Sequence, residues 1–91
     1  MKPLPKKQAY LVEVLVSRLF ADMCNEKNRG PKFSWCRFPE MAAGHVIGNW
    51  GLYQPLPNER RRMEIEVWTR RIAADMVTRS GFCPNEYPEQ R

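Results

Sequence analysis

The chain has 91 residues, 43% of them hydrophobic, and a formal net charge of +5. This length allows one small domain with a modest core, and this hydrophobic content excludes a chain that is disordered by composition. No apolar run is long enough to span a membrane, so we expect no membrane partner. A basic surface favours nucleic acid, an anionic membrane or an acidic protein face, and the first and last of these are the partners we expect.

The cysteines indicate a reducing compartment. Cys24, Cys36 and Cys83 are odd in number and far apart, which argues against a disulfide framework. The first seven residues are charged and Pro-containing, unlike a secretory signal. We therefore expect a cytoplasmic location.

In chain order, residues 1–6 are expected to form a basic flexible arm, followed by a single helical domain over 7–81. Apolar side chains at helical spacing predict a helix over 7–28, ended by the Gly-Pro pair that follows Arg29. This stripe consists of Val12, Leu15, Leu19 and Met23, widened by Val16 and Phe20. Tyr10 and Val14 lie off the stripe, so this helix is either central in the fold or partly covered by a partner.

The segment 31–39 alternates basic, aromatic and small residues, and we expect an extended loop there. Its candidate partner-binding residues are Lys32, Phe33, Trp35 and Arg37. Aromatic rings beside cations can stack on bases while the cations contact phosphates, and they can also anchor a protein interface. The alternative is that the aromatic rings cap the core between the helices.

A second helix is predicted over 40–53, with Pro39 suited to its first turn. Glycines in its interior lower its helix propensity. A third helix is predicted over 58–80, with Asn58 as N-cap and Gly81 as the C-terminal stop. Its apolar stripe consists of Ile65, Trp68, Ile72 and Met76. Residues 82–91 form a polar tail that contains proline.

The third helix carries most of the candidate binding charge. Cations near a helix N-terminus are mildly unfavourable, so an arginine triplet there suggests either a solvated surface or an acidic partner. The candidate residues are Arg60, Arg61, Arg62, Arg70 and Arg71. Glu66 stands four residues before Arg70, and Glu64 is within reach of Arg60 or Arg61, so these acids can neutralise part of the charge within the helix. A solvated, self-paired face and a binding face both remain open.

Metal binding and catalysis are not expected. Cys24, Cys36, His45 and Cys83 are zinc-ligand types, but they lack the short local spacings that make a zinc motif specific. The chain has a single histidine, and it has no Gly-rich phosphate loop or nucleophile-elbow motif. We therefore expect no metal, no cofactor and no enzymatic activity.

The sequence thus predicts an all-α, three-helix domain, with two functional hypotheses. The first is a small non-enzymatic regulator or inhibitor that docks on a larger protein, such as an acidic or nucleic-acid-handling machine. Phages and mobile elements encode small basic chains of this style to modulate host enzymes. The second is a direct DNA- or RNA-binding protein, which would use the N-terminal lysines, Arg60–Arg62 and the aromatic segment. A homodimer that buries the outer face of the first helix is a weaker third possibility.

Overall fold

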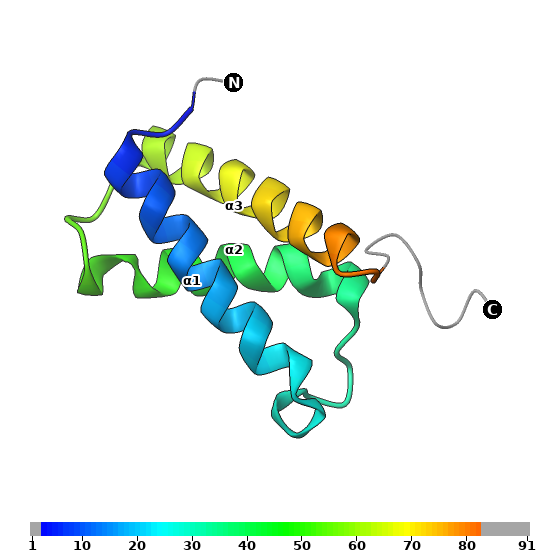
Figure 1. Ribbon diagram of the computed structural model, residues 1–91. Helices are drawn as coiled ribbons and strands as arrows, with labels where there is room; N and C mark the ends of the chain where they lie inside the picture. Colours follow the sequence, from blue (N-terminus) through cyan, green and yellow to red (C-terminus); the bar gives the residue numbers. More distant parts are fainter. Residues whose placement is uncertain (1–2, 83–91) are drawn as a thin grey trace.

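The computed structural model describes residues 3–82, which form three α-helices with no strand (Figure 1). The helices are α1 (Lys6–Cys24), α2 (Phe38–Asn49) and α3 (Glu59–Arg79). Three short 3-10 turns join or extend them, η1 (Glu26–Asn28), η2 (Trp35–Arg37) and η3 (Trp50–Leu52). The predicted all-α, three-helix class is confirmed.

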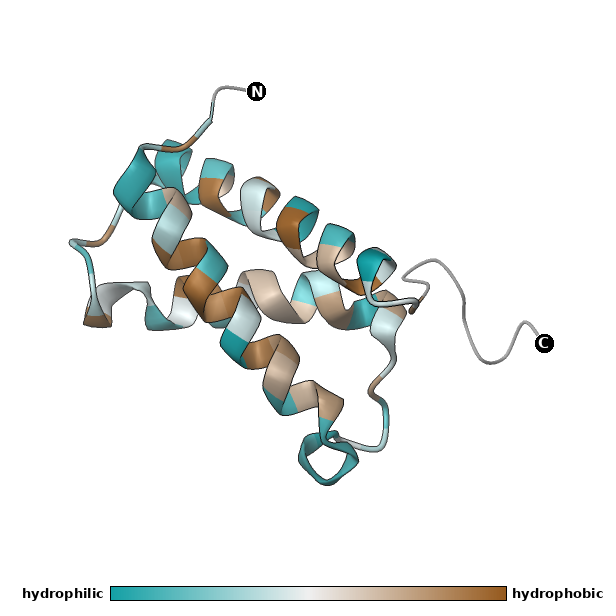
Figure 2. Cartoon of the chain, in the orientation of Figure 1, coloured by the Kyte–Doolittle hydropathy of each residue, from teal (hydrophilic) through white to brown (hydrophobic). Residues whose placement is uncertain are grey.

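The helices α2 and α3 pack most extensively on each other, and α1 lies across both (Figure 1). All three bury apolar side chains in one core. Figure 2 shows that the middle of α1 is mainly hydrophobic, whereas η1 and the first turns of α1 and α3 are hydrophilic. The stripe predicted for α1 is confirmed at Val12, Leu15 and Leu19, which are all buried.

The buried stripe of α3 differs from the predicted one. Its fully buried residues are Ile65, Thr69, Ala73 and Val77, at successive intervals of four. Of the larger side chains in the predicted stripe, only Ile65 belongs to this set, and the others are half-buried beside it. Small residues at the centre of the buried stripe let the helices approach closely, and the larger side chains then pack on either side of this contact. The Thr69 hydroxyl is satisfied because it donates to the Ile65 carbonyl at 2.7 Å.

The first helix ends earlier than predicted. Asn25 adopts an extended conformation, and its side-chain oxygen accepts a hydrogen bond from the Lys27 backbone at 3.1 Å. Asparagine competes in this way with the helical backbone, so the helix stops at Cys24 and residues up to Asn28 form the separate turn η1. At the other end, Leu4 is buried in the core and Lys6 begins α1, which differs from the arm expected over residues 1–6.

Both predicted ends of α3 are confirmed. The Asn58 side chain caps the helix by accepting the Arg61 N–H at 2.8 Å. Gly81 has a φ of 88°, the left-handed conformation that glycine adopts without a steric penalty. The Gly81 and Phe82 amides donate to the Thr78 and Val77 carbonyls, which is the Schellman arrangement. The tail prediction for residues 83–91 lies outside the described residues.

The connector before α2 is only partly extended. Ser34 is extended, but the chain then turns through η2 and enters α2 directly at Phe38. The extended conformation predicted for 31–39 is therefore wrong both at residues 31–32, which form a turn, and beyond Ser34. Phe38 is fully buried, so the aromatic residues of this segment are drawn toward the core instead of alternating along a strand.

Candidate functional site

Two of the arginines that begin α3 are engaged in ion pairs within their own helix. The Arg61 Nε lies 3.3 Å from a Glu64 oxygen, which is one of the two Glu64 pairings that the sequence allows. The Arg62 Nε donates to Glu66 Oε2 at 3.2 Å, a pair that is not among those predicted from the sequence. Such exposed pairs contribute only ~0.2–1 kcal/mol to stability, but they reduce the charge available to a partner.

Arg70 connects α3 to α2. Its Nε donates to a Glu40 carboxylate oxygen at 2.7 Å, and its terminal nitrogen lies 3.4 Å from the second oxygen. The same guanidinium lies 3.8 Å from Glu66, the pairing that the sequence predicts. The contact with Glu40 joins residues thirty positions apart and could not be read from local spacing. Arg70 is therefore largely committed to holding the two helices together.

Arg60 and Arg71 are the exposed cations of α3 that have no carboxylate partner within residues 3–82. The helical repeat places both on the outer face of α3, with the exposed Val67 between them. Of the five candidate arginines, these two retain the most charge for an external ligand.

The aromatic residues of the connector form part of a cluster. Trp35 stacks on Phe82 with ring centroids 4.4 Å apart and planes 13° apart. Its other ring contacts are with Phe20 at 5.1 Å, Phe33 at 5.0 Å and Phe38 at 5.4 Å. We call these five rings the aromatic cluster. One face of the Trp35 indole is therefore occupied by Phe82, whereas Lys32 and Arg37 beside the cluster are exposed.

Arg29 fastens the connector to the cluster. Its Nε donates to the Met23 carbonyl near the end of α1. Its guanidinium lies 5.3 Å from the Phe33 ring centroid and 5.4 Å from that of Trp35, within the range of cation–π attraction. The contacts of Phe33 and Trp35 are those of rings that cap the core.

No group of three or more His, Cys, Asp or Glu side chains within residues 3–82 is placed to hold a metal ion. Cys24 is exposed, and the half-buried Cys36 lies 2.9 Å from the Ser34 hydroxyl. The His45 ring faces the Asn49 amide of its own helix at 3.4 Å. Cys83 lies outside the described residues.

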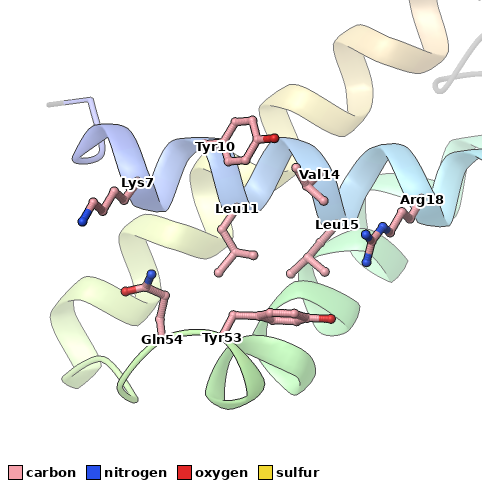
Figure 3. Close-up of a pocket in the computed structure, with 8 residues that line it drawn as sticks. All are labelled: Lys7, Tyr10, Leu11, Val14, Leu15, Arg18, Tyr53 and Gln54. Atoms are coloured by element: carbon pink, nitrogen blue, oxygen red, sulfur yellow. The ribbon is translucent and has the colours of Figure 1, made fainter.

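A groove opens between α1 and the chain that follows η3 (Figure 3). We call it the α1–η3 groove, and its volume is about 280 Å³. Its lining residues are Lys7, Tyr10, Leu11, Val14, Leu15, Arg18, Tyr53 and Gln54. Figure 3 shows Leu11 and Leu15 pointing from α1 toward the Tyr53 ring, with Lys7 near one end of the groove and Arg18 near the other.

The buried residue Trp50 holds in place the side of the groove that lies opposite α1. Trp50 is only 1% exposed, and its carbonyl accepts hydrogen bonds from both the Tyr53 and the Gln54 amides at 3.0 Å. This turn holds Tyr53 and Gln54 opposite α1. The position of Tyr10 and Val14 off the core stripe is the sequence signal for this groove, whereas no sequence pattern indicates its charged ends or Tyr53.

None of the described helices is long and apolar enough to cross a membrane. Comparison of the chain with protein-family models, with curated proteins and with solved structures finds no match.

Proposed function

We propose that this protein is a small non-enzymatic regulator that acts by docking on a larger protein. The observation that carries the proposal is the apolar surface around η3, where large side chains face solvent. Their exposed fractions are 69% for Tyr10, 74% for Leu52, 51% for Tyr53 and 78% for Leu56. Concentrations of exposed apolar side chains on a small domain are typical of protein-interaction sites.

The local backbone favours docking at low entropic cost. Leu52 ends η3, and Leu56 sits between two prolines of the connector to α3. A Cβ added at Gly51 would lie 3.2 Å from the Leu56 side chain, so Leu56 packs directly over this glycine. Prolines and a close backbone contact restrict the connector before binding, and a preorganised surface loses less entropy when a partner binds.

Direct nucleic-acid binding is the second candidate function. It is favoured by Arg60 and Arg71, which are exposed on one face of α3 without a carboxylate partner among residues 3–82. Cations that contact phosphates release counterions, so affinity of this origin falls steeply as salt rises. Direct nucleic-acid binding would leave the apolar surface around η3 without a role, and for that reason we prefer protein docking.

The test compares three variants with the wild type. Leu52→Ser with Leu56→Ser removes apolar surface at η3, and Met63→Ser removes an exposed apolar side chain on α3 as the control. Arg60→Ala with Arg71→Ala removes the two arginine charges of α3 that have no carboxylate partner within residues 3–82. A protein partner found by affinity capture is purified, and its affinity for each variant is measured directly. We expect only the leucine variant to lose about tenfold or more in affinity.

Anisotropy with labelled single- and double-stranded DNA and RNA completes the test. Micromolar binding at about 0.15 M salt that is lost in the arginine variant would replace protein docking by nucleic-acid binding. Weak attraction confined to low salt would reject the nucleic-acid function.

A further inference from the structure

We propose that the α1–η3 groove receives an amphipathic helix of an acidic protein partner, with apolar side chains in the groove and a carboxylate at each end. This inference rests on the proposed docking function and specifies the surface and the chemistry of the partner. Lys7 and Arg18 would pair with the two carboxylates.

The spacing of residues along α1 favours a helical partner. Lys7, Tyr10, Leu11, Val14 and Arg18 occupy positions i, i+3, i+4, i+7 and i+11 of one helix. Residues at these intervals share a face, so α1 has an outer amphipathic stripe in addition to its core stripe. The two cations stand about 16 Å apart along the helix axis, roughly three turns. A partner helix with the same spacing of acidic residues would match both ends.

The charge of the groove favours an acidic partner. The groove lining contains two cations and no carboxylate. Neither Lys7 nor Arg18 has an ion pair within residues 3–82, so both remain available to a partner. Opposite charges at the rim of an interface fix register and accelerate association.

The size of the groove favours a protein partner over a small molecule. A volume of about 280 Å³ lies at the lower limit of small-molecule sites, which usually span ~300–1,000 Å³. A groove of this volume accommodates a few side chains of a partner protein better than a complete small-molecule ligand. The aromatic residues at the groove, Tyr10 and Tyr53, are of the type that dominates binding energy at protein interfaces.

Charge also disfavours a second copy of this chain as the occupant. In a two-fold dimer through this face, antiparallel copies of α1 would place Lys7 against Arg18, and parallel copies would place each cation against itself. Both arrangements bring like charges together at the ends of an apolar contact. Nucleic acid is disfavoured because its phosphates would have to lie over the apolar side chains between the two cations.

The experiment uses synthetic peptides as probes. A fluorescein-labelled helical peptide carries leucines at i+3, i+4 and i+7 and glutamates at i and i+11. A matched peptide has lysines in place of these two glutamates, and a third has the same composition with its leucines spread around the helix. The full-length protein is titrated into each. We expect the glutamate peptide to bind about tenfold more tightly than the lysine peptide, and the third peptide to bind weakly.

A charge reversal in the protein makes the test specific. Lys7→Glu with Arg18→Glu should reverse the preference, so that the lysine peptide binds more tightly. Lys6→Glu with Lys27→Glu changes the net charge equally at exposed positions outside the groove, and should leave the preference unchanged. Tyr10→Ser should weaken the binding of the glutamate peptide about tenfold. Circular dichroism confirms that each variant is folded.

Equal affinity for the glutamate and lysine peptides would overturn the inference, as would a preference that the charge reversal does not change. A dimer in sedimentation that Tyr10→Ser abolishes would assign the groove to a second copy and overturn it too. If the peptides fail while a purified partner still depends on Leu52 and Leu56, docking stands and only this groove is wrong. If neither the peptides nor a partner binds, the docking function fails as well.

Discussion

The Phe82 ring closes the aromatic cluster from the C-terminal end of α3. Its position follows from Gly81, whose left-handed conformation ends the helix and turns the chain back toward Trp35. Stacked aromatic pairs contribute about 0.5–1.5 kcal/mol beyond the area they bury. The Phe82 ring also lies 6.4 Å from the Phe20 ring of α1, so this side chain at the end of α3 contacts both α1 and the connector between α1 and α2.

We expect Phe82→Ala to lower the free energy of unfolding by about 1–3 kcal/mol, because both the stacking and the burial of the ring are lost. Urea denaturation followed by circular dichroism measures the change. Leu52→Ala is the control, since Leu52 is exposed and its loss should change stability by less than about 0.5 kcal/mol. Equal effects of the two substitutions would contradict a structural role for Phe82.

The role of Trp35 shows why single residues are hard to assign from sequence. A tryptophan between basic residues is typical of a base-stacking or interface residue, and the local sequence offers no reason to choose otherwise. Its partners Phe20 and Phe82 lie fifteen and forty-seven positions away, and only the fold brings them together. A Trp35→Ala variant would therefore reduce stability as well as any binding, so it cannot by itself locate a binding site.

At the scale of elements, α2 contains two glycines that its fold does not require. A Cβ at Gly44 or Gly48 would meet no atom within 4 Å, and neither residue has a positive φ. Glycine in a helix interior is less favourable than alanine by about 0.8–1.0 kcal/mol. The helix is thus held by packing of Phe38, Val46 and Trp50 in the core rather than by intrinsic propensity.

Gly44→Ala with Gly48→Ala should therefore raise the free energy of unfolding by about 1–2 kcal/mol. Thermal denaturation provides the measurement. Gly81→Ala should have the opposite sign and cost about 1–2 kcal/mol, because its φ of 88° is strained for any residue with a Cβ. An increase in stability for all three substitutions would contradict the assigned conformation of Gly81.

The interface of α3 with the rest of the core includes a small residue. Ala73 is fully buried in the core, whereas Ala74 is only half-buried. Ala73→Leu should destabilise the protein by about 1–3 kcal/mol or more, since a larger side chain would force the helices apart. Ala74→Leu introduces the same side chain one position later and should cost less than about 1 kcal/mol. Comparable losses in urea denaturation would show that the interface is not tightly packed at Ala73.

At the scale of the whole molecule, the strength of packing differs among the helices. The contact between α2 and α3 is the largest, and these two helices follow each other directly along the chain. Contacts between neighbouring elements require less loop closure than contacts that reach back to the N-terminus. We therefore expect the pair formed by α2 and α3 to be the most stable unit, with α1 completing the core against it.

Native-state hydrogen exchange tests this hierarchy. We expect the amides in the middle of α1, at Val12 and Val16, to exchange through a partial opening at a lower free energy than those of Val46 and Ile65. The difference should be about 1 kcal/mol or more, measured at low denaturant concentrations. A single opening free energy shared by all three helices would instead indicate that the domain opens only as a whole.

How much of the structure can be predicted from the sequence depends on how far apart along the chain the interacting residues lie. The helical class, the Asn58 cap and the Gly81 stop depend on neighbouring residues, and each is confirmed. The predicted end of α1 lies too late in the chain, because the Asn25 side chain ends the helix before the Gly-Pro pair is reached. The α1–η3 groove joins Tyr10 to Tyr53, which no local pattern relates.

The stacked pair of Trp35 and Phe82 also gives this domain an optical property. The three tryptophans have separate surroundings, because Trp50 is buried in the core, Trp68 is half-buried on α3 and Trp35 lies in the aromatic cluster. With Trp50 and Trp68 replaced by phenylalanine, the only indole emission would come from the place where α1, the connector and the end of α3 converge. The fluorescence of that single residue would then report, without an added dye, when these three segments separate.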